Sequence, residues 1–151
     1  MITIEEFKKK HSNKARFVGL DLGSKRIGVS ICDERQSIAT PFKTINKTNT
    51  NELVEMLKTV IKENNIKGII IGNPINMDGS LGRSAQSVND VASNISKSID
   101  LPVILWDERL STVGAFKLSG QLDINVSKRV KTIDQNAAAF ILQGAIDYLN
   151  N

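Results

Sequence analysis

The stretch that decides the fold is Phe17-Val18-Gly19-Leu20-Asp21-Leu22-Gly23-Ser24-Lys25-Arg26-Ile27-Gly28-Val29-Ser30. The stretch contains one β-rich run, Phe17–Leu22, and most of a second, Ile27–Cys32, with a short polar gap between them. A gap this short indicates a hairpin, so the two strands should run antiparallel. A third run, Ser37–Ile45, follows after another short gap and extends the hairpin to a meander. Pro41 lacks a backbone N–H, which predicts that this third strand lies at the edge of the sheet.

After the meander the pattern changes to a helical period. Apolar residues spaced three and four apart predict a helix over Asn51–Asn64, and a second such pattern predicts another over 85–99. Ile66–Ile71 and Val103–Trp106 are short apolar runs typical of buried strands. Strands that are joined through helices run parallel to a neighbour. The sequence therefore predicts an α/β fold in which a mixed five-stranded sheet is flanked by helices.

The two ends of the chain are more polar. The last part predicts a short helix over Thr112–Leu118, a flexible basic loop over Ser119–Thr132, and a helix that begins at Asp134. Residues 1–15 are expected to form a basic arm or short helix with a solvated surface, and residues 16–151 a single domain. Within the arm, the side chains at positions 3 and 6 match a capping box, and the single histidine is expected to be exposed and chemically idle.

The composition is typical of a globular cytoplasmic protein, with 40% hydrophobic and 24% charged residues. No apolar run approaches the ~20 residues needed to cross a bilayer, and the N-terminus lacks the pattern of a signal peptide. The single cysteine, Cys32, excludes an internal disulfide and a cysteine-based zinc site, and we expect it to be a core thiol. We therefore expect a cytoplasmic protein without membrane contact.

The charge permits a polyanionic partner without proving one. The formal net charge is +4 and the pI is about 9.3, so the surface is mildly attractive to nucleic acid. Aromatic residues make up only 5% of the chain, which argues against recognition by stacking bases on aromatic rings.

Two acids break the apolar pattern of the predicted buried strands. Asp21 interrupts the first strand, and Glu108 directly follows the last one. A third acid, Asp134, begins the final predicted helix. Each has a structural alternative: Asp21 could bond the following turn, Glu108 could pair with Arg109 or Arg26, and Asp134 could be a helix N-cap. Together, however, they can converge at one end of the sheet, where a carboxylate cluster suits a hard divalent cation such as Mg²⁺.

Four segments carry a family resemblance, in this order along the chain: Gly19–Ser30, Gly72–Ser80, Trp106–Thr112 and Asp134–Ala138. They resemble the first motif, the G-x-P-x-x-x-D-G-[ST] loop, the D-E-R-L-[ST]-T motif and the D-x-x-[AS]-A motif of the YqgF/RuvX family. That family belongs to the RNase H-like superfamily, beside the RuvC-type Holliday junction resolvases. The resemblance covers residues 16–149, and four motifs in register make it specific. Asp78, in the second motif, is interpreted as an acid that caps its own loop.

The resemblance implies an RNase H-like fold and a hydrolase that cuts phosphodiester bonds with divalent metal. The acidic residues of the family correspond to Asp21, Glu108 and Asp134, which are implied to be both the catalytic residues and the metal ligands. Two ions, Mg²⁺ or Mn²⁺, would activate water and stabilise the leaving oxygen. Basic residues near these acids are predicted to bind the substrate: Lys25, Arg26, Arg109, Lys128, Arg129 and Lys131. The structural alternative is a solvated turn for Lys25 and an exposed loop for the last three, and Arg109 could instead neutralise the carboxylates.

The function that the resemblance favours is processing of the 5′ end of the 16S rRNA precursor during ribosome biogenesis. A Holliday junction resolvase acting on branched DNA is the alternative, and it would have to be a stable dimer to cut two strands symmetrically. The sequence leaves open whether the protein is a monomer or a homodimer. A non-catalytic nucleic-acid-binding module is a minor alternative, disfavoured because all three acids are present. The Gly19–Gly23 run also resembles the start of actin-like ATPases and sugar kinases, but those enzymes need two such domains and this chain supplies one.

Overall fold

The computed structural model describes residues 1–10, 14–110 and 126–151, with the backbone alone for residues 126–135. The elements follow one another as α1 (Ile4–Lys10), β1 (Arg16–Leu22), β2 (Arg26–Cys32), β3 (Ala39–Asn46), α2 (Thr50–Asn64), β4 (Ile66–Asn73), α3 (Arg83–Ser98), β5 (Val103–Asp107), the 3-10 turn η1 (Glu108–Leu110) and α5 (Val126–Leu149). The predicted helix over Thr112–Leu118 lies outside the described residues. Within the described part of the chain, no helix has the length and apolar character needed to span a membrane.

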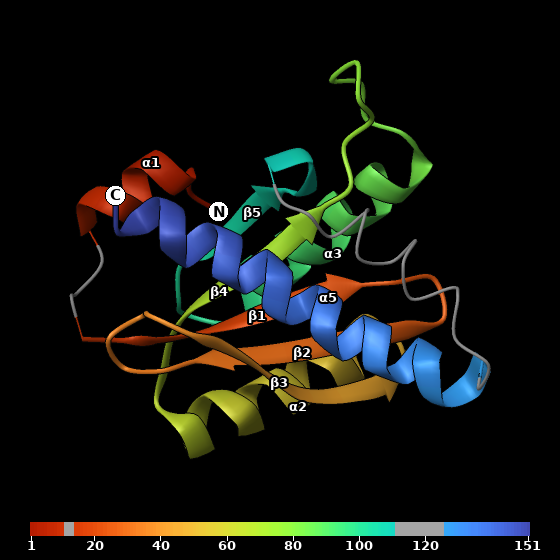
Figure 1. The fold of residues 1–151 in the computed structure, drawn as a ribbon, viewed down its shortest axis with the longest axis horizontal. Coiled ribbons are helices and arrows are strands. Elements are labelled where there is room, and N and C mark those ends of the chain that lie inside the picture. Colours follow the sequence, from red (N-terminus) through yellow and green to blue (C-terminus); the bar gives the residue numbers. More distant parts are fainter. Residues whose placement is uncertain (11–13, 111–125) are drawn as a thin grey trace.

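The strands form one mixed sheet in the order β3-β2-β1-β4-β5 (Figure 1). β2 pairs antiparallel with β1 and β3, while β4 pairs parallel with β1 and β5. This confirms the predicted meander with two added parallel strands, each of which returns through a helix. β3 lies at an edge, as Pro41 predicts, and the β2–β3 ladder shifts register between Val29 and Ser30, next to this proline.

Side chains of each strand alternate between two core clusters, one on each face of the sheet. On one face Leu20 packs with residues of α2 and α3. On the opposite face Phe17 packs with residues of α5, which crosses the sheet in Figure 1. Because successive strand residues point to opposite faces, Gly19 and Asp21 share the α5 face with Phe17. The buried acid of the first strand therefore lies on the side that α5 covers.

Helix α5 lies directly against β1 and β2. A Cβ atom at Gly19 would stand 2.5 Å from Ser30 Oγ and 2.7 Å from Leu142 Cβ, so only glycine fits at this position. The fully buried Ser30 hydroxyl donates to the Ala138 carbonyl oxygen across a distance of 2.8 Å. The absence of a side chain at Gly19 and the hydroxyl of Ser30 thus set how closely α5 approaches β1, the strand that carries Asp21.

The final helix begins earlier than the sequence predicted. α5 starts at Val126, so the expected loop up to Thr132 and helix start at Asp134 were wrong. Val126, Val130 and Ile133 are spaced four and three apart and continue the apolar pattern of the later helix, which the basic residues between them obscured. Asp134 therefore stands inside the helix and is not its N-cap. The basic residues expected in a flexible loop also stand on helical backbone: Lys128, Arg129 and Lys131.

The N-terminal segment forms α1 and contributes to the core. The Glu6 N–H donates to Thr3 Oγ1 over 3.1 Å, which confirms one of the two hydrogen bonds of the predicted capping box. Phe7 is only 2% exposed and its ring centroid lies 5.0 Å from that of Phe17. The expectation of a solvated segment holds for the exposed lysines at positions 8–10 but was wrong for Phe7, because its ring packs against the sheet.

Cys32 closes β2 as a buried thiol. Its sulfur accepts a hydrogen bond from the Phe17 N–H, with 3.2 Å between nitrogen and sulfur. Burial raises the pKa of Cys32 to about 11, which keeps the thiol protonated at neutral pH. The predicted core thiol is confirmed.

Candidate active site

Asp21 is the only acid that the described part of the chain buries, at 6% exposure. It is the penultimate residue of β1 and is paired with Gly28 of β2. The alternation of the strand directs it to the α5 face, at the end of the sheet where β1, β4 and β5 all terminate. Functional groups of open sheets gather at this carboxyl edge.

Glu108 follows the last residue of β5 and begins η1. A Cβ atom built at Gly72 of β4 would stand 3.3 Å from Glu108 Cδ and 2.5 Å from Ile141 Cδ1 of α5. The carboxyl group of Glu108 therefore lies over β4 on the α5 face, in space that the missing side chain at position 72 leaves available.

The strand register brings this carboxyl group toward Asp21. Leu20 of β1 pairs with Ile71 of β4, so the next position on β4, Gly72, lies beside Asp21. Neighbouring strands lie about 5 Å apart. Asp21 and Glu108 thus share one face and one edge of the sheet, and the position between them carries no side chain.

Asp134 approaches the same edge through its place in α5. It stands one helical turn before Ala138, whose carbonyl accepts the Ser30 hydroxyl and which is fully buried against the sheet. The spacing of four residues places positions 134 and 138 in the same row of the helix. The side chain of Asp134 lies outside the described residues. Among the described side chains, no group of three or more acids, cysteines and histidines forms a metal-holding cluster.

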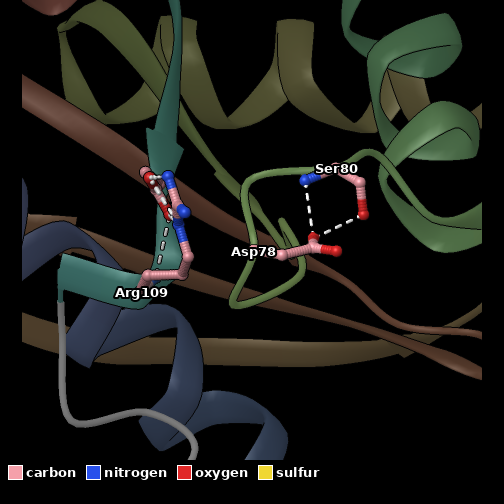
Figure 2. Close-up of polar contacts among 4 residues, drawn as sticks. Asp78, Ser80 and Arg109 are labelled. Carbon is pink, nitrogen blue, oxygen red and sulfur yellow. Dashed lines mark hydrogen bonds and ion pairs between the residues drawn. The ribbon is translucent and has the colours of Figure 1, made fainter.

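Arg109 forms an ion pair with Asp107, the residue just before Glu108. Arg109 Nη2 lies 2.7 Å from Asp107 Oδ2, and Arg109 Nε lies 3.1 and 3.0 Å from the two carboxylate oxygens (Figure 2). The hydrogen bonds from Arg109 lower the pKa of Asp107. Sequence reasoning had not given Asp107 a role; the signal was an acid two residues before an arginine at a strand end. The pair holds the guanidinium at the rim of the site.

The loop after β4 is ordered by its own acid, also drawn in Figure 2. Asp78 Oδ1 accepts from the Ser80 N–H at 2.9 Å and from the Ser80 hydroxyl at 2.6 Å. These hydrogen bonds lower the pKa of Asp78. Gly79, between these two residues, has a φ of +90°, a backbone conformation that favours glycine. The interpretation of Asp78 as a loop-capping acid is confirmed.

The predicted basic residues of the first hairpin lie at the same edge of the sheet. Lys25 is exposed in the β1–β2 turn, and its carbonyl accepts the Lys47 N–H at 2.8 Å. Arg26 opens β2 opposite Asn46 and is half-buried. Its buried Nε has no hydrogen-bond partner among the residues that the structure describes. The basic residues at positions 128, 129 and 131 have described backbone but no described side chains.

Comparison with known proteins adds a family match and close relatives. The model of the RuvX family, described as Holliday junction resolvase, matches residues 15–148. A relative from Pelagibacter ubique, provisionally named a pre-16S rRNA nuclease, is 87% identical over the whole of both chains. One from Cereibacter sphaeroides with the same provisional name is 43% identical over 98% of this chain and 92% of its own.

Solved structures show the same architecture. RuvC of Thermus thermophilus, solved in complex with a Holliday junction substrate, matches 89% of this chain and 94% of its own with a TM-score of 0.54 and 11% identity. A second Thermus thermophilus RuvC structure matches 88% of this chain and 95% of its own with a TM-score of 0.51 and 10% identity. At such identities the likeness shows the fold alone, and it confirms the RNase H-like fold.

Proposed function

This chain belongs to the RuvX family, and from that premise we propose that it is a metal-dependent endonuclease that hydrolyses phosphodiester bonds at the 5′ end of the 16S rRNA precursor. The observation that supports this most directly is the placement of Glu108 over Gly72, beside the buried Asp21. Two ionised carboxylates held close together repel each other, and a cation bound between them would remove that repulsion.

The donors at this edge fit a hard divalent cation, Mg²⁺ or Mn²⁺. Carboxylate oxygens are the ligands such ions prefer, and neither cysteine nor histidine stands with Asp21 and Glu108 at this edge among the described residues. Asp21 and Glu108 would hold the metal from the sheet, and Asp134 would complete the set from α5. When bound, two such ions would activate a water and stabilise the charge on the leaving oxygen.

The basic side chains around the acids would position the nucleic acid. Lys25 and Arg26 would bind phosphates from the β1–β2 turn, and Arg109 would do so from the opposite side of the site. The ion pair with Asp107 holds Arg109 in one orientation, so its remaining amino group can meet a phosphate without a further loss of side-chain entropy. We assign three further phosphate contacts to the first turns of α5: Lys128, Arg129 and Lys131.

The provisional names of the relatives favour RNA as the substrate, and the single buried Cys32 suits action in the reducing cytoplasm. Cleavage of four-way DNA junctions is the second candidate, because the family model is described as a Holliday junction resolvase and RuvC shares the fold. A junction resolvase must cut two strands symmetrically and would have to act as a dimer. The oligomeric state therefore separates the two candidates.

The decisive experiment offers both substrates side by side with Mg²⁺ and measures the mass of the active species. We expect cleavage of a 16S precursor with a 5′ extension, and loss of that cleavage in Asp21→Asn while the circular dichroism spectrum is unchanged. Asp90→Asn, at an exposed position of α3, is the matched control and should cut normally. Clean, folded wild-type protein that cuts neither substrate would overturn the enzyme function.

A further inference from the structure

A pocket of about 190 Å³ opens at the carboxyl end of β1, on the face of the sheet opposite α5. The β1–β2 turn, the β3–α2 connection and the first turns of α3 surround it. Its floor includes Leu22, Leu53 and Val88, whose cluster packs between the sheet and the helices α2 and α3. None of the residues assigned to the carboxylate site lines it.

The lining of this pocket is that of a binding site with an apolar base and a polar rim. Leu22 and Val91 are only half-buried, so the floor is open to solvent. Hydroxyl groups, including that of Ser87, stand around the opening. The volume is below the roughly 300–1,000 Å³ of pockets for drug-sized ligands, so the pocket suits a group about the size of one nucleobase.

The rim of the pocket is positively charged. Lys47 and Arg83 line it and are exposed, and neither takes part in an ion pair with the residues that the structure describes. Arg83 begins α3, whose N-cap Gly82 makes no side-chain hydrogen bond, so the backbone N–H groups of this first turn can donate to an anion. Thr48, which lines the pocket, donates its hydroxyl to the Glu52 carboxylate. The charges favour a phosphate beside the apolar floor.

We propose that this pocket binds one unstacked nucleotide of a single-stranded segment of the substrate, with the base on the apolar floor and a phosphate at Lys47 and Arg83. The proposal rests on the proposed nuclease function. Gly23 and Ser24 line the pocket and follow Asp21 by two and three residues, which places the turn within about 10 Å of Asp21. One strand can therefore cross the sheet edge and reach both sites. A base inside a continuous duplex stays stacked and cannot enter, so the pocket selects unpaired nucleic acid.

The test measures binding without catalysis, in EDTA. The probes are a short fluorescent single-stranded RNA and the same RNA annealed to its complement. Ser87→Phe places a ring over the pocket from an exposed helical position, and Asn94→Phe adds the same ring at an exposed position of α3 outside the pocket. We expect Ser87→Phe to weaken binding of the single strand about tenfold, roughly the loss of one buried apolar contact, and to leave duplex binding unchanged. Equal binding of the single strand by both variants would overturn the proposal.

A second measurement locates the nucleotide directly. Methyl chemical shifts of Leu53 and Val88 should move when adenosine or uridine monophosphate is added to the wild-type protein, and should not move in Ser87→Phe. Absence of any shift in wild type would also overturn the pocket assignment. Failure of the nuclease function is distinguishable, because it would appear as loss of cleavage with binding and methyl shifts intact.

Discussion

The carboxyl carbon of Glu108 lies 3.3 Å from the point where a Cβ atom of residue 72 would stand, so Gly72 and Glu108 occupy adjoining parts of one space. The same point lies 2.5 Å from Ile141 Cδ1, which confines the space from the α5 side. Asp21 stands beside Gly72 on the neighbouring strand. The geometry of the carboxylates therefore depends on a residue that has no functional group.

Gly72→Ala should impair cleavage more than folding. The added methyl group must displace both the Ile141 side chain and the Glu108 carboxyl, at a cost of about 1–3 kcal/mol of unfolding free energy. Because Glu108 must move, we expect kcat to fall at least tenfold, roughly the loss that one displaced catalytic group causes. Urea unfolding and single-turnover cleavage of the 16S precursor measure the two effects.

Gly68→Ala is the matched control on the same strand. A Cβ at Gly68 would meet Phe7 Cζ at 3.0 Å and Phe17 Cδ1 at 3.1 Å, far from the carboxylates along β4. It should lower stability with little change in kcat. If both alanine variants lose stability and activity to the same degree, the position of Glu108 over Gly72 is not what the activity depends on.

Divalent metal should stabilise the folded chain through Asp21. A ligand that binds only the folded state adds RT ln(1 + [L]/Kd), about 2.7 kcal/mol at one hundred times Kd. We therefore expect Mg²⁺ or Mn²⁺ to raise the Tm of wild type, and EDTA to reverse the rise. In Asp21→Asn the rise should disappear. Differential scanning fluorimetry measures these Tm values. An equal rise of Tm with metal in both proteins would show that Asp21 is not a metal ligand.

The Asp107–Arg109 pair should be visible in a pH titration. Hydrogen bonds from Arg109 lower the pKa of Asp107 below the ordinary aspartate value of about 3.9. The contribution of the pair to stability is therefore complete above the ordinary value and is lost as the pH falls through the lowered pKa. In Arg109→Ala, carboxyl NMR should show the pKa of Asp107 rising toward its ordinary value, because the side-chain hydrogen bonds are lost while the backbone N–H of residue 109 still donates.

Asp33 provides the internal reference for that titration. Its pKa is lowered chiefly by backbone N–H groups, with Ile38 the largest cause and Ser37 also donating, and it should not respond to Arg109→Ala. A normal pKa for Asp107 in the wild-type protein would contradict the ion pair.

Cys32 should be unreactive in the folded protein. Because burial raises the pKa of its thiol to about 11, the thiolate is scarce at pH 8 and the sulfur is inaccessible. Ellman's reagent should label it only after denaturant is added. Rapid labelling of native protein would show that β2 opens at its end.

Much of the fold could be predicted from local sequence. Three signals involve only residues close together in the chain: the short gap after Leu22, the proline in the third run and the helical period after residue 50. The structure confirms the hairpin, the edge strand and the helix that they predict. The start of α5 could not be predicted, because basic residues diluted the apolar spacing of Val126, Val130 and Ile133. The burial of Phe7 was missed for a related reason: one apolar residue among lysines carries no periodic signal.

The sequence by itself determined that Asp21 is an acid within an apolar strand and that Glu108 directly follows another apolar strand. It could not state that the two lie on the same face and at the same end of the sheet, since strand order and the face of each side chain depend on contacts between distant segments. Only the tertiary structure placed β4 between their strands, Gly72 at the intervening position and α5 over both. The physical reason is that alternation and turn length are local properties, whereas the space open to a carboxylate is set by every element packed around it.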